Sequence, residues 1–133
     1  KIQTDLFYPN GLAFAADHCS LFVAETGTKW IWRMRWNPIS CQVEHSEKFL
    51  ETGGSIGPDG IALSHDNHLF AAIYGSQHIL SMDINSKTTK EIFTPGMNPT
   101  NCALDRQGIQ GLIVTEAQNG QLLQWDCTKK GLL

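Results

Sequence analysis

One short pattern that occurs three times constrains the fold of this chain more than any other feature. Each copy begins with a proline, at Pro9, Pro58 and Pro99, and continues into an apolar segment. The copies start about 40 to 50 residues apart, which is the period at which four-stranded blades repeat in β-propellers. Two further matching segments follow each copy, at residues 21–27, 69–75 and 112–117 and then at residues 30–36, 79–83 and 122–126. The repeat therefore predicts three successive blades.

Strand patterning runs through all three copies, because apolar residues alternate or form short runs between clusters of Gly, Pro, Asn and Asp. Residues 43–50 and 90–93 supply fourth, outer strands to the first two copies, and residues 1–7 resemble an outer strand that ends a preceding blade. We therefore predict an all-β chain, a β-propeller with three four-stranded blades. The predicted blades cover about residues 8–52, 53–95 and 96–133, with strand 1–7 completing a blade in the ring.

The third segment of the first copy shows strand alternation clearly. Four large side chains fall on one face of the expected strand: Trp30, Trp32, Met34 and Trp36. We interpret this face as a packing surface between neighbouring blades, in preference to an aromatic cage around a ligand.

Charge argues against nucleic acid and membrane partners. The chain has a formal net charge of −3, and its ten Lys and Arg residues form no stripe that could follow a phosphate backbone. No apolar run is long enough to span a bilayer. The first residues do not resemble a signal peptide and include no initiating Met, so we expect a mature piece, or part of something longer, that is soluble.

The four cysteines leave the redox compartment open. Their sequence positions include no CxxC pair of the kind that zinc sites favour, so free thiols are expected, with a single disulfide as the alternative. The cytoplasm is the favoured location.

Four stretches resemble one known family, the gluconolactonase or senescence marker protein-30 family. They are residues 8–14 with Pro-Asn-Gly, residues 21–28, residues 57–63 with Pro-Asp-Gly, and residues 98–103 with Asn-Pro-Thr-Asn. The resemblance implies a six-bladed propeller that holds a divalent metal in its central channel and hydrolyses lactones. It also implies that this chain corresponds to the C-terminal half, so that three blades would be half of the ring.

The same resemblance assigns metal-binding roles to Asn10 and Asp59. Carboxylate and amide oxygens suit a hard cation, so calcium is the first expectation, with zinc, manganese or magnesium as alternatives. Asn-Gly and Asp-Gly are also ordinary turn dipeptides, which is the alternative interpretation of both sites. The resemblance further implies a catalytic role for Asp59 as general base, although a metal-bound carboxylate is a poor base because the cation lowers its pKa.

Other polar residues fall at related positions of the repeat. Thr100 and Asn101 begin the third inner segment, and we expect them to line the channel and contact substrate. Glu25 and Glu116 end second segments, where a solvent-facing or structural carboxylate is favoured over a ligand. The resemblance places the family's remaining metal-binding Glu in the other half of the propeller.

Three functions stay open at this point. The first is a metal-dependent hydrolase of a sugar-lactone-like cyclic ester, formed when two copies of the chain pair as a homodimer and complete a six-bladed ring. The second is a binding or structural module without catalysis. The third is an inactive fragment of a full-length lactonase.

Overall fold

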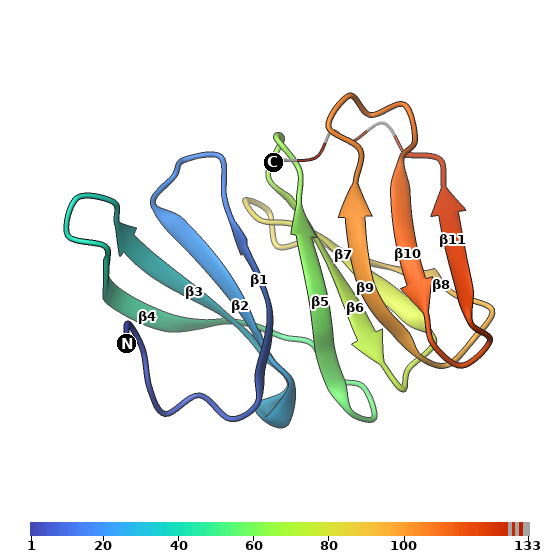
Figure 1. Cartoon of the computed structure of the whole chain (residues 1–133), viewed down its shortest axis with the longest axis horizontal. Coiled ribbons are helices and arrows are strands. Elements are labelled where there is room, and N and C mark those ends of the chain that lie inside the picture. Colours follow the sequence, from blue (N-terminus) through green and yellow to red (C-terminus); the bar gives the residue numbers. More distant parts are fainter. Residues whose placement is uncertain (128, 130, 132–133) are drawn as a thin grey trace.

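A computed structural model describes residues 1–127, 129 and 131 of the chain (Figure 1). Three antiparallel sheets follow one another along the sequence. Sheet 1 contains β1 (Pro9–Phe14), β2 (Ser20–Glu25), β3 (Trp30–Asn37) and β4 (Gln42–Glu51), with the short 3-10 helix η1 (Thr26–Thr28) after β2. Sheet 2 contains β5 (Gly57–Leu63), β6 (His68–Tyr74), β7 (His78–Asp83) and β8 (Thr89–Phe93). Sheet 3 contains β9 (Pro99–Leu104), β10 (Leu112–Glu116) and β11 (Gln121–Trp125).

The sheets confirm the all-β prediction. In the described part of the chain they contain four, four and three strands, where three four-stranded blades were predicted. Within each sheet the strands pair in chain order, so every sheet is a simple meander. The three copies of the proline pattern form the first strands β1, β5 and β9, which lie side by side across the molecule (Figure 1). This is a propeller-type arrangement, in which the first strand of each sheet faces the common axis.

The hydrophobic core lies between the sheets, and β6 contributes to it from both faces. Leu69, Ala71 and Ile73 pack into the cluster shared by sheets 1 and 2, whereas Phe70 and Ala72 pack into the cluster shared by sheets 2 and 3. Successive side chains of a strand point to opposite faces, so this alternation places the middle sheet between its two neighbours. A strand that is buried on both faces is predominantly apolar, as β6 is.

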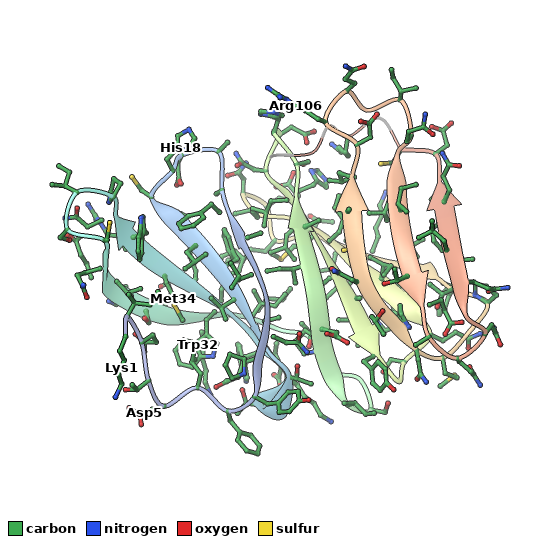
Figure 2. The ribbon with its side chains drawn as sticks, in the orientation of Figure 1. Lys1, Asp5, His18, Trp32, Met34 and Arg106 are labelled. Atoms are coloured by element: carbon green, nitrogen blue, oxygen red, sulfur yellow. The ribbon has the colours of Figure 1, made fainter. Side chains whose placement is uncertain are left out.

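The predicted alternation of β3 is also present. Ile31 is buried in the cluster between sheets 1 and 2, while Met34 and Trp32 belong to a separate cluster on the outer face of sheet 1. Leu6 packs against that outer cluster, and Figure 2 shows Lys1 and Asp5 on the same side as Trp32 and Met34. These contacts agree with a packing role for Trp32 and Met34, and their place between neighbouring blades stays a prediction.

The strand expected over residues 1–7 is absent from the single chain. These residues, all of them described, form no strand, and the segment instead crosses the outer face of sheet 1 through Leu6. Within the described part of the chain, residues 1–7 join none of the sheets, and their pairing in a complete ring stays a prediction.

All four cysteines are free, which matches the expected thiols and not the alternative disulfide. Burial raises the pKa of the Cys102 thiol to about 12, so this group is an unreactive part of the core. In the described part of the chain, no helix is long and apolar enough to cross a membrane.

Candidate functional site

The site begins with two glycines that let the inner strands approach each other. A Cβ atom added at Gly11 would overlap the Asp59 carbonyl oxygen on β5, and one added at Gly60 would overlap the Asn101 side chain on β9. Glycine is therefore required at these two contacts, because any larger residue would separate the strands. The Pro-x-Gly motif thus brings the preceding residues Asn10 and Asp59 together.

Asn10 and Asp59 lie side by side at the starts of β1 and β5. Asn10 is exposed and Asp59 is half-buried. Burial raises the pKa of the Asp59 carboxyl above its ordinary value, and a hydrogen bond with the Asn10 side chain opposes that rise. The two predicted ligands therefore meet, and they present an amide oxygen and a carboxylate from adjacent strands.

Thr26 holds this pair in place, although the sequence pattern did not single it out. Its hydroxyl donates a 2.6 Å hydrogen bond to the carbonyl oxygen of Pro58, the residue before Asp59. The same hydroxyl accepts a 3.5 Å hydrogen bond from the side-chain amide of Asn10. Its position in the segment that follows β2, which matches the family pattern, was the available signal.

Thr100 and Asn101 occupy a different environment. The Thr100 hydroxyl lies 2.7 Å from the Thr115 hydroxyl on β10, and the Asn101 side chain accepts a 2.9 Å hydrogen bond from the Cys102 N–H while it lies against Gly60. Neither residue lines the cavity that contains Asn10 and Asp59. Their contact with a substrate stays a prediction.

A cavity of about 530 Å³ opens at the end of the sheets where Asn10 and Asp59 lie. The turns that carry His18 and Arg106 lie at the opposite end (Figure 2). The inner strands and the η1 segment contribute four residues that line the cavity: Asn10, Asp59, Thr26 and Gly27. Four large side chains complete its wall: Phe7, Tyr8, Ile56 and Tyr74.

Glu25 and Glu116 are structural carboxylates, and each is only 2% exposed. Glu25 accepts hydrogen bonds from the Phe7 N–H at 2.7 Å, the Trp32 indole N–H at 2.8 Å and the Thr28 hydroxyl. Burial alone would raise the pKa of the Glu25 carboxyl, but these hydrogen bonds outweigh burial and lower it.

Glu116 is the corresponding structural carboxylate of sheet 3. It accepts backbone hydrogen bonds from Asn98 at 3.0 Å, Gln118 at 2.9 Å and Asn119 at 2.8 Å. Burial opposes these bonds, yet their combined effect lowers the pKa of the Glu116 carboxyl. Neither carboxylate lines the cavity.

The donor set at the site consists of oxygens, which suits a hard cation, but it is small. Among the residues that the structure describes, no three His, Cys, Asp or Glu side chains gather closely enough to hold a metal. Calcium takes six to eight oxygen ligands. Asn10 and Asp59 therefore fit part of a cation's coordination shell.

The SMP-30/gluconolactonase/LRE-like family model matches residues 1–118. The chain belongs to this family. A putative sugar lactone lactonase of Bacillus subtilis is 26% identical over 119 residues, which cover 88% of this chain and 41% of that protein. The chain spans less than half the length of the curated relatives that it matches.

Two solved structures have the same fold over most of this chain. A gluconolactonase from Xanthomonas campestris superposes with a TM-score of 0.74 and 28% identity, over 86% of this chain and 37% of that one. A calcium-binding regucalcin from Agrobacterium tumefaciens superposes with a TM-score of 0.82 and 21% identity, over 97% of this chain and 50% of that one. The first relative and the first structure named here are both lactonases, which supports lactone hydrolysis at the level of the family.

Proposed function

We propose that this member of the SMP-30/gluconolactonase family forms the substrate-binding half of a lactone hydrolase. The observation that carries the proposal is the meeting of Asn10 and Asp59 on adjacent inner strands, beside a cavity large enough for a small molecule. The residues that the family resemblance selects for metal binding are also the residues that the glycine contacts bring together. The substrate is a cyclic ester, and the product is the open hydroxy acid.

In this proposal Asn10 and Asp59 supply oxygen ligands to a divalent cation, with calcium as the first candidate and zinc, manganese or magnesium as alternatives. A cation bound there would polarise the lactone carbonyl and stabilise the negative charge that develops during hydrolysis. Thr26 positions both ligands through its bonds to Asn10 and Pro58. We assign Asp59 first to the role of cation ligand. The role of general base is its second assignment.

Further ligands must come from the remainder of a ring, and we propose a second copy of the chain as its source. Two copies about a twofold axis would give six sheets around one channel. Sheet 3 supports this idea, because among the described residues it has one strand fewer than its neighbours, and its last strand exposes Leu122, which is 73% accessible. The segment 1–7 of the other copy would pair there through the residues that precede Phe7, after Leu6 leaves the outer face of sheet 1. Phe7 itself would keep its hydrogen bonds to Glu25 and Gly27.

Light scattering over a concentration series, with and without calcium, tests the assembly. A mass of two chains supports the homodimer, and a compact monomer at all concentrations contradicts it. The remainder of the ring would then have to be a different polypeptide segment.

A hydrolysis assay with a panel of lactones and added calcium, zinc, manganese or magnesium tests the chemistry. We expect cation-dependent turnover that is lost in Asp59→Ala and kept in Ile39→Ala, whose side chain is 94% exposed in a turn remote from the site. A folded assembly that binds lactones but never turns them over would favour the alternative, a binding module without catalysis.

A further inference from the structure

The cavity beside Asn10 and Asp59 has an unusually apolar wall for a surface opening. Phe7 is 67% exposed, Tyr8 is 68% exposed and Ile56 is 48% exposed, and all three line the cavity together with the half-buried Tyr74. Large apolar side chains exposed together at one opening mark a binding site more often than those scattered singly.

The Phe7–Tyr8 side of this wall is fixed in place. The Phe7 N–H donates to the buried Glu25 carboxylate at 2.7 Å, and the Phe7 carbonyl accepts a 3.1 Å hydrogen bond from the Gly27 N–H. A Cβ atom at Gly27 would overlap the Phe7 ring, so the ring lies directly on this glycine. Segments before a first strand are normally mobile, and here the backbone is tied down at several points.

Tyr8 adopts a conformation that its own preferences oppose. Its φ angle is +58°, in the left-handed region that non-glycine residues seldom occupy. The Thr26 N–H donates to the Tyr8 carbonyl at 3.1 Å and helps to hold this backbone. Backbone strain of this kind persists where neighbouring groups fix it and concentrates at binding sites.

The opposite side of the wall is tied as well. The Ser55 hydroxyl donates to the Gly75 carbonyl at 2.5 Å, and the Ser55 N–H donates to the Ser76 hydroxyl at 2.9 Å. Ile56 follows Ser55 and lies close to Gly75, where an added Cβ atom would be 3.1 Å from the end of its side chain. Both apolar sides of the cavity are therefore held by hydrogen bonds.

Charged groups are few in this cavity, and Tyr8 and Tyr74 add only one hydroxyl each to its large side chains. Asp59 is the only charged residue among the lining residues, which are all described, and the Thr26 hydroxyl already donates to Pro58. A polyhydroxylated sugar lactone carries several hydroxyl groups that need partners on every side. Phe7 and Ile56 offer none, so a sugar hydroxyl group that lies against either of these two side chains would have no partner.

From this arrangement we propose that the preferred substrate is a lactone with an apolar or aryl substituent, and that Phe7, Tyr8, Ile56 and Tyr74 determine this preference. The ester group would lie at Asn10 and Asp59, with the substituent between the two apolar sides. Hydrolysis adds one water across the acyl C–O bond of the ring, giving a carboxylic acid and a free hydroxyl group. This inference rests on the proposed function, because it names the substrate class of the same site.

A matched pair of non-hydrolysable ligands tests the preference without any metal or turnover. The probes are an aryl-fused lactam, 3,4-dihydroquinolin-2-one, and the polyhydroxylated gluconolactam. Binding is followed through the NMR signals of the tyrosine and phenylalanine rings in the whole chain. We expect the aryl-fused lactam to bind at least tenfold more tightly and to shift the Tyr8 and Tyr74 signals.

Tyr8→Asn is the informative variant, because Asn tolerates the left-handed backbone that Tyr8 adopts. It should weaken binding of the aryl-fused lactam at least fivefold and leave gluconolactam unchanged. Ile39→Asn, remote from the cavity, is the matched control and should change neither. Equal or tighter binding of gluconolactam, no binding of either probe, or an unaffected Tyr8→Asn variant would overturn the inference.

The assays also separate this inference from the proposed function. Cation-dependent hydrolysis that favours gluconolactone over dihydrocoumarin would overturn the substrate preference while supporting the hydrolase. Tight aryl-lactam binding at Tyr8 without hydrolysis of any lactone would support the apolar site and contradict the hydrolase.

Discussion

Sheets 1 and 2 use different chemistry at one equivalent position of their second strands. Glu25 ends β2 opposite Pro9, and Ile73 lies near the end of β6 opposite Pro58. Glu25 binds three hydrogen-bond donors, whereas Ile73 is fully buried in the core between the two sheets. The backbone arrangement is the same, but the Glu25 side chain accepts hydrogen bonds from three neighbours, and the Ile73 side chain is part of the core.

The difference follows from what each position has to satisfy. In sheet 1 the segment that enters the first strand brings the Phe7 N–H to Glu25, and a buried carboxylate requires hydrogen-bond donors. In sheet 2 the entering segment is tied by Ser55 and Ser76 instead, which leaves the interior position free for an apolar side chain. A repeat can therefore preserve geometry while it exchanges the interaction that maintains it.

Exchanging the apolar residue for the acidic one should have the largest effect. Ile73→Glu places a carboxylate among apolar side chains, away from the donors that Glu25 has, and a buried unpaired charge costs several kcal/mol, about 4 or more. We expect the variant to be largely unfolded, as measured by urea denaturation. Ile73→Val is the control and should cost only about 1 kcal/mol. A stable Ile73→Glu variant would mean that the position reaches solvent.

Removing the Glu25 carboxylate from sheet 1 should have an intermediate effect on the free energy of unfolding. Glu25→Ala leaves the Phe7 N–H and the Trp32 indole N–H without their acceptor, which should reduce the free energy of unfolding by about 1 to 3 kcal/mol. Urea denaturation monitored by tryptophan fluorescence measures the loss. Glu44→Ala, an exposed carboxylate paired with Arg35, is the matched control and should change stability by less than about 1 kcal/mol. Equal losses in both variants would show that Glu25 is not a special acceptor.

The buried carboxylates of Glu25 and Glu116 also predict that the fold is sensitive to acid. The pKa values of Glu25 and Glu116 are lower in the folded chain than the ordinary value of 4.5. Their stabilisation is therefore complete above that value and is lost as the pH falls through the lowered pKa values. Unfolding measured from neutral pH to below pH 4.5 should show this loss, and Glu25→Gln should reduce its steepness. An unchanged slope in Glu25→Gln would assign the acid sensitivity to other groups.

The repeat allowed much of this structure to be predicted. Three proline patterns at a blade-like period predict three sheets, and the family resemblance of the Pro-x-Gly motifs implies that Asn10 and Asp59 belong to one site. Sequence alone could not assign the first seven residues, because alternation shows which face of a strand is apolar but not which edge it pairs with. Leu6 packs on the face of sheet 1 instead.

The missed parts of the site have a common physical cause. Phe7 and Tyr8 lie before β1 and Thr26 lies in η1, outside the strands, where no periodicity shows which side chains converge. Burial of Glu25 was equally hidden, because a carboxylate at the end of a strand is usually solvated. Its three donors, Phe7, Thr28 and Trp32, come from the segment before β1, from η1 and from β3. They meet only in the folded sheet.

The smallest expected effect sharpens the comparison between carboxylates. Glu25 has three donors that offset its burial, whereas burial dominates at Asp59, whose pKa is raised and for which the Asn10 side chain is the opposing hydrogen-bond partner. Asp59→Asn should therefore increase the free energy of unfolding at neutral pH, by less than about 1 kcal/mol because the half-buried group is still partly screened by solvent. Glu25→Gln should decrease it.

Thermal unfolding of both variants at neutral pH, without added cations, measures whether Asp59→Asn raises stability and Glu25→Gln lowers it. Asp59→Asn should also lose cation-dependent hydrolysis, since an amide supplies no charge to a cation. A gain of stability together with a loss of activity is typical of a residue retained for function at a cost to the fold. If Asp59→Asn destabilises the chain as Glu25→Gln does, Asp59 would belong with the structural carboxylates, and its assignment as a cation ligand would lose its physical support.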